Sequence, residues 1–329
     1  MILTLTANPS IDRTASIPNQ LERGGVFRLS EPTDIAGGKG INVSEAIHLA
    51  GVDTLALFPA NPQGHFVRLV RAANIPHEVV DVAANTRVNL TVVEEDGTTT
   101  KLNSAGIALT DAELNAVIAR AVELSAAADW VVLAGSLPSG TPRDFYVRCI
   151  QAMRARRPEL QIAVDTSDAP LTALATALRS NDPTLGRKIA PNVIKPNGFE
   201  LGQFLGIDGD RLEDDAAAGD LSGVVAAARE LNALGIDQVL VTLGATGALL
   251  VAAGHDPIFA TPPQIIPRST VGAGDCTLAG FLMSTTEKLS LSDGLARAVA
   301  YGASATSLPG TTIPTPSQVH PDQAIITIL

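Results

Sequence analysis

Three small residues stand directly before a carboxylate in the stretch STVGAGDCTLAGF (269–281): Gly272, Ala273 and Gly274 precede Asp275. An apolar, small-residue segment follows and predicts a helix. Small residues let backbone N–H groups approach a ligand closely, and a helix N-terminus adds unpaired N–H groups and the positive end of its dipole. The pattern indicates an anion site with a base beside it. The plainer alternative is a turn whose acid only complements the helix dipole.

A second glycine-rich stretch, GGKGIN (37–42), places Lys39 between glycines where a helix begins. Backbone N–H groups would hold an anion there and the ammonium would neutralise it, although a turn with a solvated lysine fits the same letters. Further cations lie at Arg28, Arg87 and Lys101. Most such side chains are solvated, but Arg87 opens a predicted hairpin, and its guanidinium can bind a phosphate with two N–H groups.

A third stretch, KPNGFEL (195–201), sets Glu200 about one helical turn beyond Asn197. A carboxylate and an amide on one side of a helix could hold the waters of a Mg²⁺ ion, which prefers oxygen ligands and keeps several waters. An ordinary acid in a first helical turn is the alternative. The stretch predicts a metal-linked site or a simple helix start.

Short apolar runs alternate with longer helical patterns along the chain. The apolar runs cover 1–7, 54–58, 130–135, 161–165, 193–197 and 238–244, and the helical patterns cover 39–50, 64–73, 142–156, 218–234 and the segment after Gly274. Continuous apolar strands joined by helices indicate a parallel sheet covered on both faces. The predicted fold class is α/β.

Two segments, 13–35 and 86–104, interrupt this alternation. The second, TRVNLTVVEEDGTTTKLN, alternates polar and apolar residues around a DG pair, as a hairpin with one solvated face does. We expect the two segments to pair into a small sheet outside the main layer.

Polar residues gather where the predicted strands end. They are Asn8 and Asp12, Gly135 and Ser136, Asp165, Lys195 and Asn197, and Thr242 and Gly244. Because ligands of open α/β sheets bind beyond the carboxyl ends of the strands, we expect one cleft to collect these groups, together with Asp275.

Composition narrows the class of partner. The chain has 329 residues, 46% of them apolar, and a formal net charge of −11, which argues against nucleic acid or an anionic membrane as partner. No uncharged apolar run is long enough for a membrane span, and the N-terminal residues are typical of a first strand rather than a signal peptide. Two distant cysteines, Cys149 and Cys276, fit a reducing compartment, so we expect a cytoplasmic protein.

Taken together, these stretches resemble the ribokinase-like (PfkB) family of carbohydrate kinases. The motifs NPSID, GGKGINV, TRVNLTV, AGSLPSG, KPNGFEL, VTLGATGALL and STVGAGDCTLAGFL occur in the family's order over nearly the whole chain. The resemblance implies one ribokinase-like domain over 1–329, with a three-layer α/β/α fold, a mainly parallel sheet and a small β-sheet lid formed by about 13–35 and 86–104. It also implies transfer of the ATP γ-phosphate to a sugar hydroxyl with Mg²⁺.

The resemblance assigns roles by motif. Asp275 would be the base, and the amides of Gly272, Ala273 and Gly274 the anion hole. Asp12, Gly38 and Asn42 would orient the sugar, while Lys39, Arg87 and Ser136 would bind the phosphate that it already carries. Lys195, Asn197 and Glu200 would lie near the ATP phosphates and Mg²⁺, with Glu200 acting on the ion through water, and Thr242 and Gly244 would lie near the nucleotide.

Within the family, NPSID, GGKGIN and GTTTKLN look most like the 1-phosphofructokinase branch, which converts fructose 1-phosphate and ATP to fructose 1,6-bisphosphate. Tagatose 6-phosphate and fructose 6-phosphate remain alternative acceptors. A non-catalytic sensor of sugar phosphate or nucleotide is the alternative outside the enzymes, although a degenerate enzyme would be expected to lose the base or the anion hole. A homodimer through the lid is a further expectation.

Overall fold

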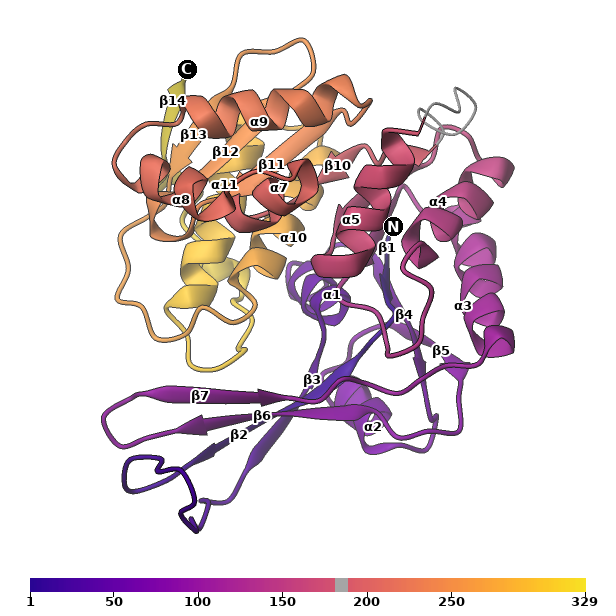
Figure 1. Ribbon diagram of the computed structural model, residues 1–329, viewed down its shortest axis with the longest axis vertical. Coiled ribbons are helices and arrows are strands. Elements are labelled where there is room, and N and C mark those ends of the chain that lie inside the picture. Colours follow the sequence, from indigo (N-terminus) through magenta and orange to yellow (C-terminus); the bar gives the residue numbers. More distant parts are fainter. Residues whose placement is uncertain (181–188) are drawn as a thin grey trace.

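The computed structural model describes residues 1–180 and 189–329 (Figure 1). Within these ranges ten strands form one large sheet in the order β14-β13-β12-β11-β10-β9-β8-β1-β4-β5. Strands β11 to β5 of this order run parallel to their neighbours, and β12, β13 and β14 run antiparallel. The bounds are β1 Ile2–Thr6, β4 Thr54–Ala60, β5 His77–Asp81, β8 Trp130–Ala134, β9 Gln161–Asp165, β10 Val193–Ile194, β11 Gln238–Thr242, β12 Ala248–Ala252, β13 Ile258–Thr261 and β14 Ile325–Ile328.

Helices cover both faces of this sheet. One face carries α1 (Lys39–Leu49), α2 (His65–Ala72), α10 (Ala273–Thr286) and α11 (Leu291–Thr306), and the other carries α3 (Asp111–Leu124), α4 (Phe145–Arg156), α5 (Asp168–Leu178), α7 (Gly198–Leu205), α8 (Gly209–Ala217) and α9 (Ser222–Ala233). Side chains of β8 alternate between the two layers: Val131 packs with the second set of helices and Val132 with the first. The predicted three-layer α/β/α fold is confirmed.

The two segments that interrupt the β/α alternation form a separate small sheet. Its order is β3-β2-β6-β7, with β2 at Ser10–Ser16, β3 at Thr33–Gly37, β6 at Arg87–Val93 and β7 at Thr99–Asn103. Strands β2 and β6 pair in parallel, and β6 turns into β7 through the predicted Asp-Gly pair. Figure 1 shows this sheet extending away from the large one. The first segment is wider than expected, since pairing begins at Ser10 and ends at Gly37.

Three local predictions need correction. The helix predicted over 218–234 begins at Ser222, and α8 precedes it as a separate helix whose Asp208 side chain accepts from the Arg211 N–H. Helix α10 begins at Ala273, before rather than after Gly274. Beyond Thr242 the sheet continues as antiparallel strands, which the sequence patterns did not separate.

The parallel strands β1, β8, β9, β10 and β11 end at the same edge of the large sheet. The residues that follow them therefore meet there, as the sequence predicts. In the described ranges, the structure contains no helix with the length and apolar character needed to cross a bilayer.

Candidate active site

Asp275 lies in the first turn of α10, with its side chain at the carboxyl edge of the large sheet. Gly272 caps the helix with a φ of 78°, a left-handed conformation that favours glycine. A Cβ added at Gly274 would lie 3.2 Å from the Lys195 Nζ, so a side chain there would push this ammonium away from the helix start. The first N–H groups of a helix lack intrahelical partners and point toward its N-terminus. The predicted anion hole therefore has a cation beside it.

The Asp275 carboxylate is buried and held from α1. Asn42 donates its Nδ2–H to Asp275 Oδ2 over 2.7 Å, and both side chains lie almost out of solvent. Burial raises the pKa of Asp275, the negative charge of Asp165 raises it further, and Lys39, Asn42 and Lys195 only partly oppose the shift, so that the pKa is about 7. A carboxyl group with this pKa is suited to accept a proton near neutral pH.

Asp165, the last residue of β9, binds two lysines with one carboxylate. Its Oδ1 accepts from Lys39 Nζ at 2.7 Å, and its Oδ2 lies 3.1 Å from Lys195 Nζ. Burial alone would raise the pKa of Asp165, which is fully buried, but the two ammonium groups outweigh burial and hold the pKa below its usual value. For Lys39 burial acts in the opposite direction and lowers the pKa. The negative charges of Asp165, Glu200 and Asp275 outweigh burial, so the pKa of Lys39 lies above its usual value.

Asn197 and Glu200 form a reciprocal cap at the start of α7. The Asn197 Oδ1 accepts from the Glu200 N–H at 2.7 Å, and the Glu200 Oε2 accepts from the Asn197 N–H at 3.0 Å. The other carboxylate oxygen, Oε1, lies 3.8 Å from Lys39 Nζ. The two side chains therefore stabilise the helix start, and one oxygen of Glu200 faces the charged cluster. Among residues 1–180 and 189–329, no group of three or more His, Cys, Asp or Glu side chains is placed to hold a metal ion by itself.

Asp12 lies on β2 of the small sheet and is oriented by two neighbours. Its Oδ1 accepts from Ser10 Oγ at 2.8 Å and from Asn89 Nδ2 at 3.0 Å. Because Oδ1 is engaged in this way, Oδ2 is the oxygen left for a ligand. Gly38 follows β3 of the small sheet as the residue before α1, and Asn42 lies on α1 beside Gly272.

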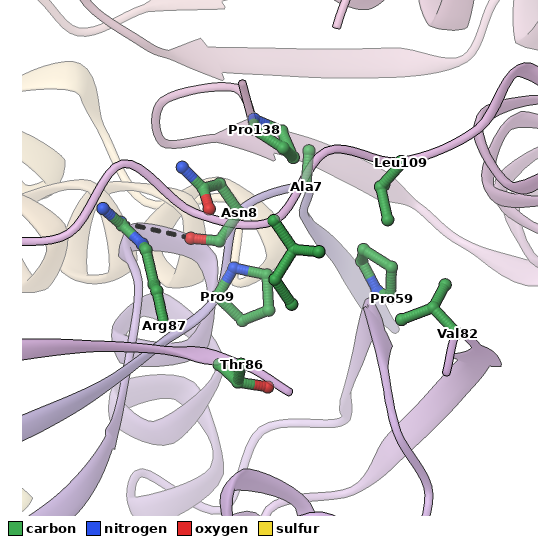
Figure 2. Close-up of a pocket in the computed structure, with 10 residues that line it drawn as sticks. Ala7, Asn8, Pro9, Pro59, Val82, Thr86, Arg87, Leu109 and Pro138 are labelled. Carbon is green, nitrogen blue, oxygen red and sulfur yellow. Dashed lines mark hydrogen bonds between the residues drawn. The ribbon is translucent and has the colours of Figure 1, made fainter. Parts of the chain in front are cut away.

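Arg87 is the first residue of β6 and contacts two chain segments that connect the small sheet to the large one. Its Nη1 donates to the Ser104 carbonyl at 2.8 Å and its Nη2 to the Asn8 carbonyl at 3.3 Å, a contact that Figure 2 shows beside a narrow, mostly apolar cavity. Burial lowers the pKa of Arg87 and the charge of Asp12 partly opposes the shift. Ser136 lies nearby in the loop after β8, where its Oγ accepts from Asn8 Nδ2 at 3.2 Å.

The predicted nucleotide residues lie further along the same edge. Thr242 ends β11 and its N–H donates to the Pro196 carbonyl, so it lies beside the start of α7. Gly244 follows in an exposed 3₁₀ turn, Gly244–Thr246. The two other cations that the sequence singled out are exposed: Arg28 lies in the link between β2 and β3, and Lys101 lies on β7.

Two residues of this site received no role from sequence reasoning. Asp165 was expected in the cleft, as a polar residue that ends a strand, but its ion pairs with two lysines depend on the order of the strands in the sheet. Asn89 was part of the TRVN stretch, and its bond to Asp12 follows from the parallel register of β2 and β6, in which these two residues are partners.

Comparison with known proteins agrees with this geometry. The family model described as "pfkB family carbohydrate kinase" matches residues 5–318. A 1-phosphofructokinase of Rhodobacter capsulatus is 34% identical, with 97% of this chain and 94% of that protein covered, and one of Xanthomonas campestris is 36% identical, with 84% and 82% covered. The crystal structure of phosphofructokinase-2 from Escherichia coli in complex with substrates and products is 30% identical, with a TM-score of 0.82 and 96% of both chains covered. The chain therefore belongs to the pfkB family of carbohydrate kinases.

Proposed function

We propose that this kinase phosphorylates fructose 1-phosphate with ATP, giving fructose 1,6-bisphosphate and ADP. The observation that carries the proposal is a buried carboxylate, Asp275, fixed by Asn42 at the N-terminus of α10 with Lys195 beside it. Phosphoryl transfer requires mainly positioning and charge stabilisation, which this arrangement can supply. The relatives named 1-phosphofructokinase support fructose 1-phosphate as acceptor.

In the proposed mechanism Asp275 accepts the proton of the attacking sugar hydroxyl as the new P–O bond forms and the bond to ADP breaks. Asn42 holds Oδ2, so Oδ1 is the oxygen that faces the hydroxyl. The N–H groups at the start of α10 and the Lys195 ammonium stabilise the negative charge on the transferred phosphoryl group. Asp12 would orient the sugar through its Oδ2.

The residues fit a magnesium ion that arrives with ATP better than one held by the protein alone. Only Oε1 of Glu200 faces the charged cluster, because Oε2 is used in the cap of α7, so Glu200 would hold the ion through a water. When bound, Mg²⁺ supplies positive charge to the phosphate oxygens. Lys195 would bind the same phosphates directly, and Asn197, Thr242 and Gly244 would line the nucleotide side of the site.

The phosphate already on the acceptor would bind to Arg87, Ser136 and Lys39. Arg87 and Ser136 share one neighbour, Asn8, which supports a common site for these two. Lys39 lies between Asp165 and Glu200, a position that also fits the ATP phosphates. The effect of Lys39→Ala on the KM for ATP distinguishes binding of the acceptor's phosphate from binding of the ATP phosphates.

A panel of acceptors tests the proposed function. We expect kcat/KM for fructose 1-phosphate to exceed that for fructose 6-phosphate and tagatose 6-phosphate, with ATP turnover that depends on the added acceptor. A higher kcat/KM for fructose 6-phosphate would make the chain a 6-phosphofructokinase. A crystal structure of phosphofructokinase-2 from Escherichia coli in complex with fructose 6-phosphate, 30% identical to this chain, makes this acceptor the first alternative to test. Binding of sugar phosphate without any turnover would support the sensor instead.

We further propose a cytoplasmic homodimer that forms through the small sheet, which we interpret as a lid. The exposed Leu102 on β7 supplies apolar surface there, and both cysteines are buried thiols, as in a reducing compartment. Sedimentation of the wild type and of Leu102→Glu tests the dimer. A monomeric wild type, or a dimer that persists in the variant, contradicts this interface.

A further inference from the structure

Asn8, in the link between β1 and β2, contacts both residues proposed for the acceptor phosphate. Its carbonyl oxygen accepts from Arg87 Nη2 at 3.3 Å, and its side-chain Nδ2 donates to Ser136 Oγ at 3.2 Å. The residue is 7% exposed, so water competes little for these bonds. Figure 2 shows Asn8 with its carbonyl directed at the Arg87 guanidinium. A single residue therefore joins a cation of the small sheet to a hydroxyl of the large one.

The Asn8 amide is also fixed by the chain segments around it. Nδ2 lies 3.2 Å from the Leu137 carbonyl and 3.5 Å from the Ala105 carbonyl. A Cβ added at Gly106, where φ is 92°, would overlap the Asn8 Oδ1. The link after β7 is therefore packed tightly on the amide and leaves it little freedom to rotate. Arg87 is held to the same link through the Ser104 carbonyl.

This arrangement restricts which way the Ser136 hydroxyl points. A hydroxyl has one hydrogen to donate and two lone pairs to accept. Because Asn8 Nδ2–H donates to a lone pair of Ser136 Oγ, the hydroxyl hydrogen points away from this amide and can be donated to an anion. Arg87 uses two of its five N–H groups on the Asn8 and Ser104 carbonyls, and its Nε is buried with no hydrogen-bond partner among the described residues. Both groups are thus oriented as donors around one residue.

We propose that Asn8 is a positioning residue that selects a phosphorylated acceptor by orienting Ser136 and Arg87 as one donor pair. The proposal rests on the proposed function, in which these two residues bind the acceptor's phosphate. Asn8 itself contacts neither ATP nor the reacting hydroxyl. Its loss should therefore weaken recognition of the acceptor's phosphate and leave the ATP site and the chemical step unchanged.

The test is Asn8→Ala, which keeps the backbone carbonyl for Arg87 and removes the bond to Ser136. We expect kcat/KM for fructose 1-phosphate to fall about 2- to 10-fold, the usual value of one neutral hydrogen bond. The KM for ATP and kcat/KM for unphosphorylated fructose should change less than about twofold. The nearly isosteric Asn8→Asp should cause a larger loss with fructose 1-phosphate only, because its carboxylate repels the phosphate.

A double-mutant cycle and a matched control complete the design. Asn8→Ala combined with Ser136→Ala should lower kcat/KM for fructose 1-phosphate no further than the more damaging of the two single variants, because the proposed effect of the Asn8 side chain on acceptor selectivity acts through Ser136. Asn192→Ala removes a structural asparagine that bonds Ile162 N and Asp237 before β10, away from the carboxyl edge, and should leave acceptor selectivity unchanged.

Two results would overturn the inference. One is additive effects of Asn8→Ala and Ser136→Ala. The other is a loss in Asn8→Ala that is equal for fructose and fructose 1-phosphate. Arg87→Ala in the same assay shows whether the role of Asn8 or the proposed phosphate site is wrong. If Arg87→Ala leaves the preference for the phosphorylated acceptor intact, the phosphate site itself is wrongly assigned. If Arg87→Ala abolishes the preference and both Asn8 variants keep it, only the role of Asn8 fails.

Discussion

The carboxyl edge of the large sheet buries its charged residues, whereas the small sheet leaves its own partly exposed. Asp165 is 0% and Asp275 6% exposed, and each is bound by side chains from other elements. On the small sheet, Asp12 and Arg87 are half-buried and every residue of β7 is exposed or half-buried. Groups that are fixed before the ligand arrives need no reorganisation during the reaction, while a sheet with few buried contacts opens and moves easily. The comparison divides the site into two halves. The preformed half, at the carboxyl edge of the large sheet, is suited to the chemistry, and the adjustable half, on the small sheet, is suited to binding the acceptor.

The largest effect is expected in the preformed half, from Asp275→Asn. Without the base, kcat should fall by roughly 10²–10⁴-fold, while the KM for ATP and the fold are kept. The substitution is nearly isosteric, and it removes a buried acid that is harder to ionise in the folded state than in the unfolded state. Because its folded pKa of about 7 lies above the unfolded value, ionisation of this acid destabilises the fold increasingly between about pH 4 and 7 and by a constant amount above pH 7. Asn removes this penalty, so Tm at pH 8 should not decrease. Retention of more than about a tenth of wild-type kcat would exclude Asp275 as the base.

Asp165→Asn tests whether the two lysines depend on one carboxylate. Removal of one partner from a buried ion pair costs about 3–5 kcal/mol, so we expect a lower Tm together with a lower kcat. The acid limb of kcat/KM should move to lower pH, because the repulsion that raises the pKa of Asp275 is lost. Asp237→Asn, before β11 at the other end of the strands, is the control. An unchanged pH profile in Asp165→Asn would show that Asp165 does not act on the base.

Two cations, Arg87 in the adjustable half and Lys39 on α1 at its boundary with the preformed half, are each expected to lower kcat/KM for fructose 1-phosphate by about ten- to a hundredfold when replaced by Ala. Charge-assisted hydrogen bonds contribute about 1.5–3 kcal/mol each, at about 1.4 kcal/mol per decade. The KM for ATP should stay within about threefold, and turnover of unphosphorylated fructose should hardly change. If Lys39 instead serves the ATP phosphates, its loss raises the KM for ATP and lowers turnover of both sugars.

A smaller effect, again in the preformed half, is expected in the pH dependence of kcat/KM of the wild-type enzyme. Asp275 must be ionised to accept a proton, and burial together with Asp165 raises its pKa to about 7. The kcat/KM for fructose 1-phosphate should therefore rise with pH up to about 7 and then level off. Titration of the enzyme between pH 5 and 9 measures this, and an acid limb near pH 4 would contradict a raised pKa.

The smallest expected effect is a change in the rate of amide hydrogen exchange in the small sheet. If it closes over the site, saturating fructose 1-phosphate should slow amide hydrogen exchange in 86–104, with little change in β8 or β9. Closure would also exclude water from the transferred phosphoryl group. Unchanged exchange in 86–104 at saturating ligand would argue that the sheet does not move.

Sequence by itself determined the α/β class and the small sheet, and it predicted most residues of the candidate site, because these depend on local signals. Apolar runs of strand length, the Asp-Gly turn between β6 and β7 and the small residues before Asp275 all act within a few residues. One local signal was interpreted differently: Asn197 and Glu200 stand three residues apart, as capping pairs do, and the structure places them in a reciprocal cap with each other.

Tertiary structure alone decided which charged and polar groups meet. Asn42 and Asp275 are 233 residues apart and Lys39 and Asp165 are 126 apart, and no local pattern couples such positions. Their contacts follow from the order of the parallel strands, which brings the ends of β1, β8, β9 and β10 to one edge, and from the packing of α1 against α10. The pKa of Asp275 is decided at the same level, because burial and the charge of Asp165 act only after the chain has folded.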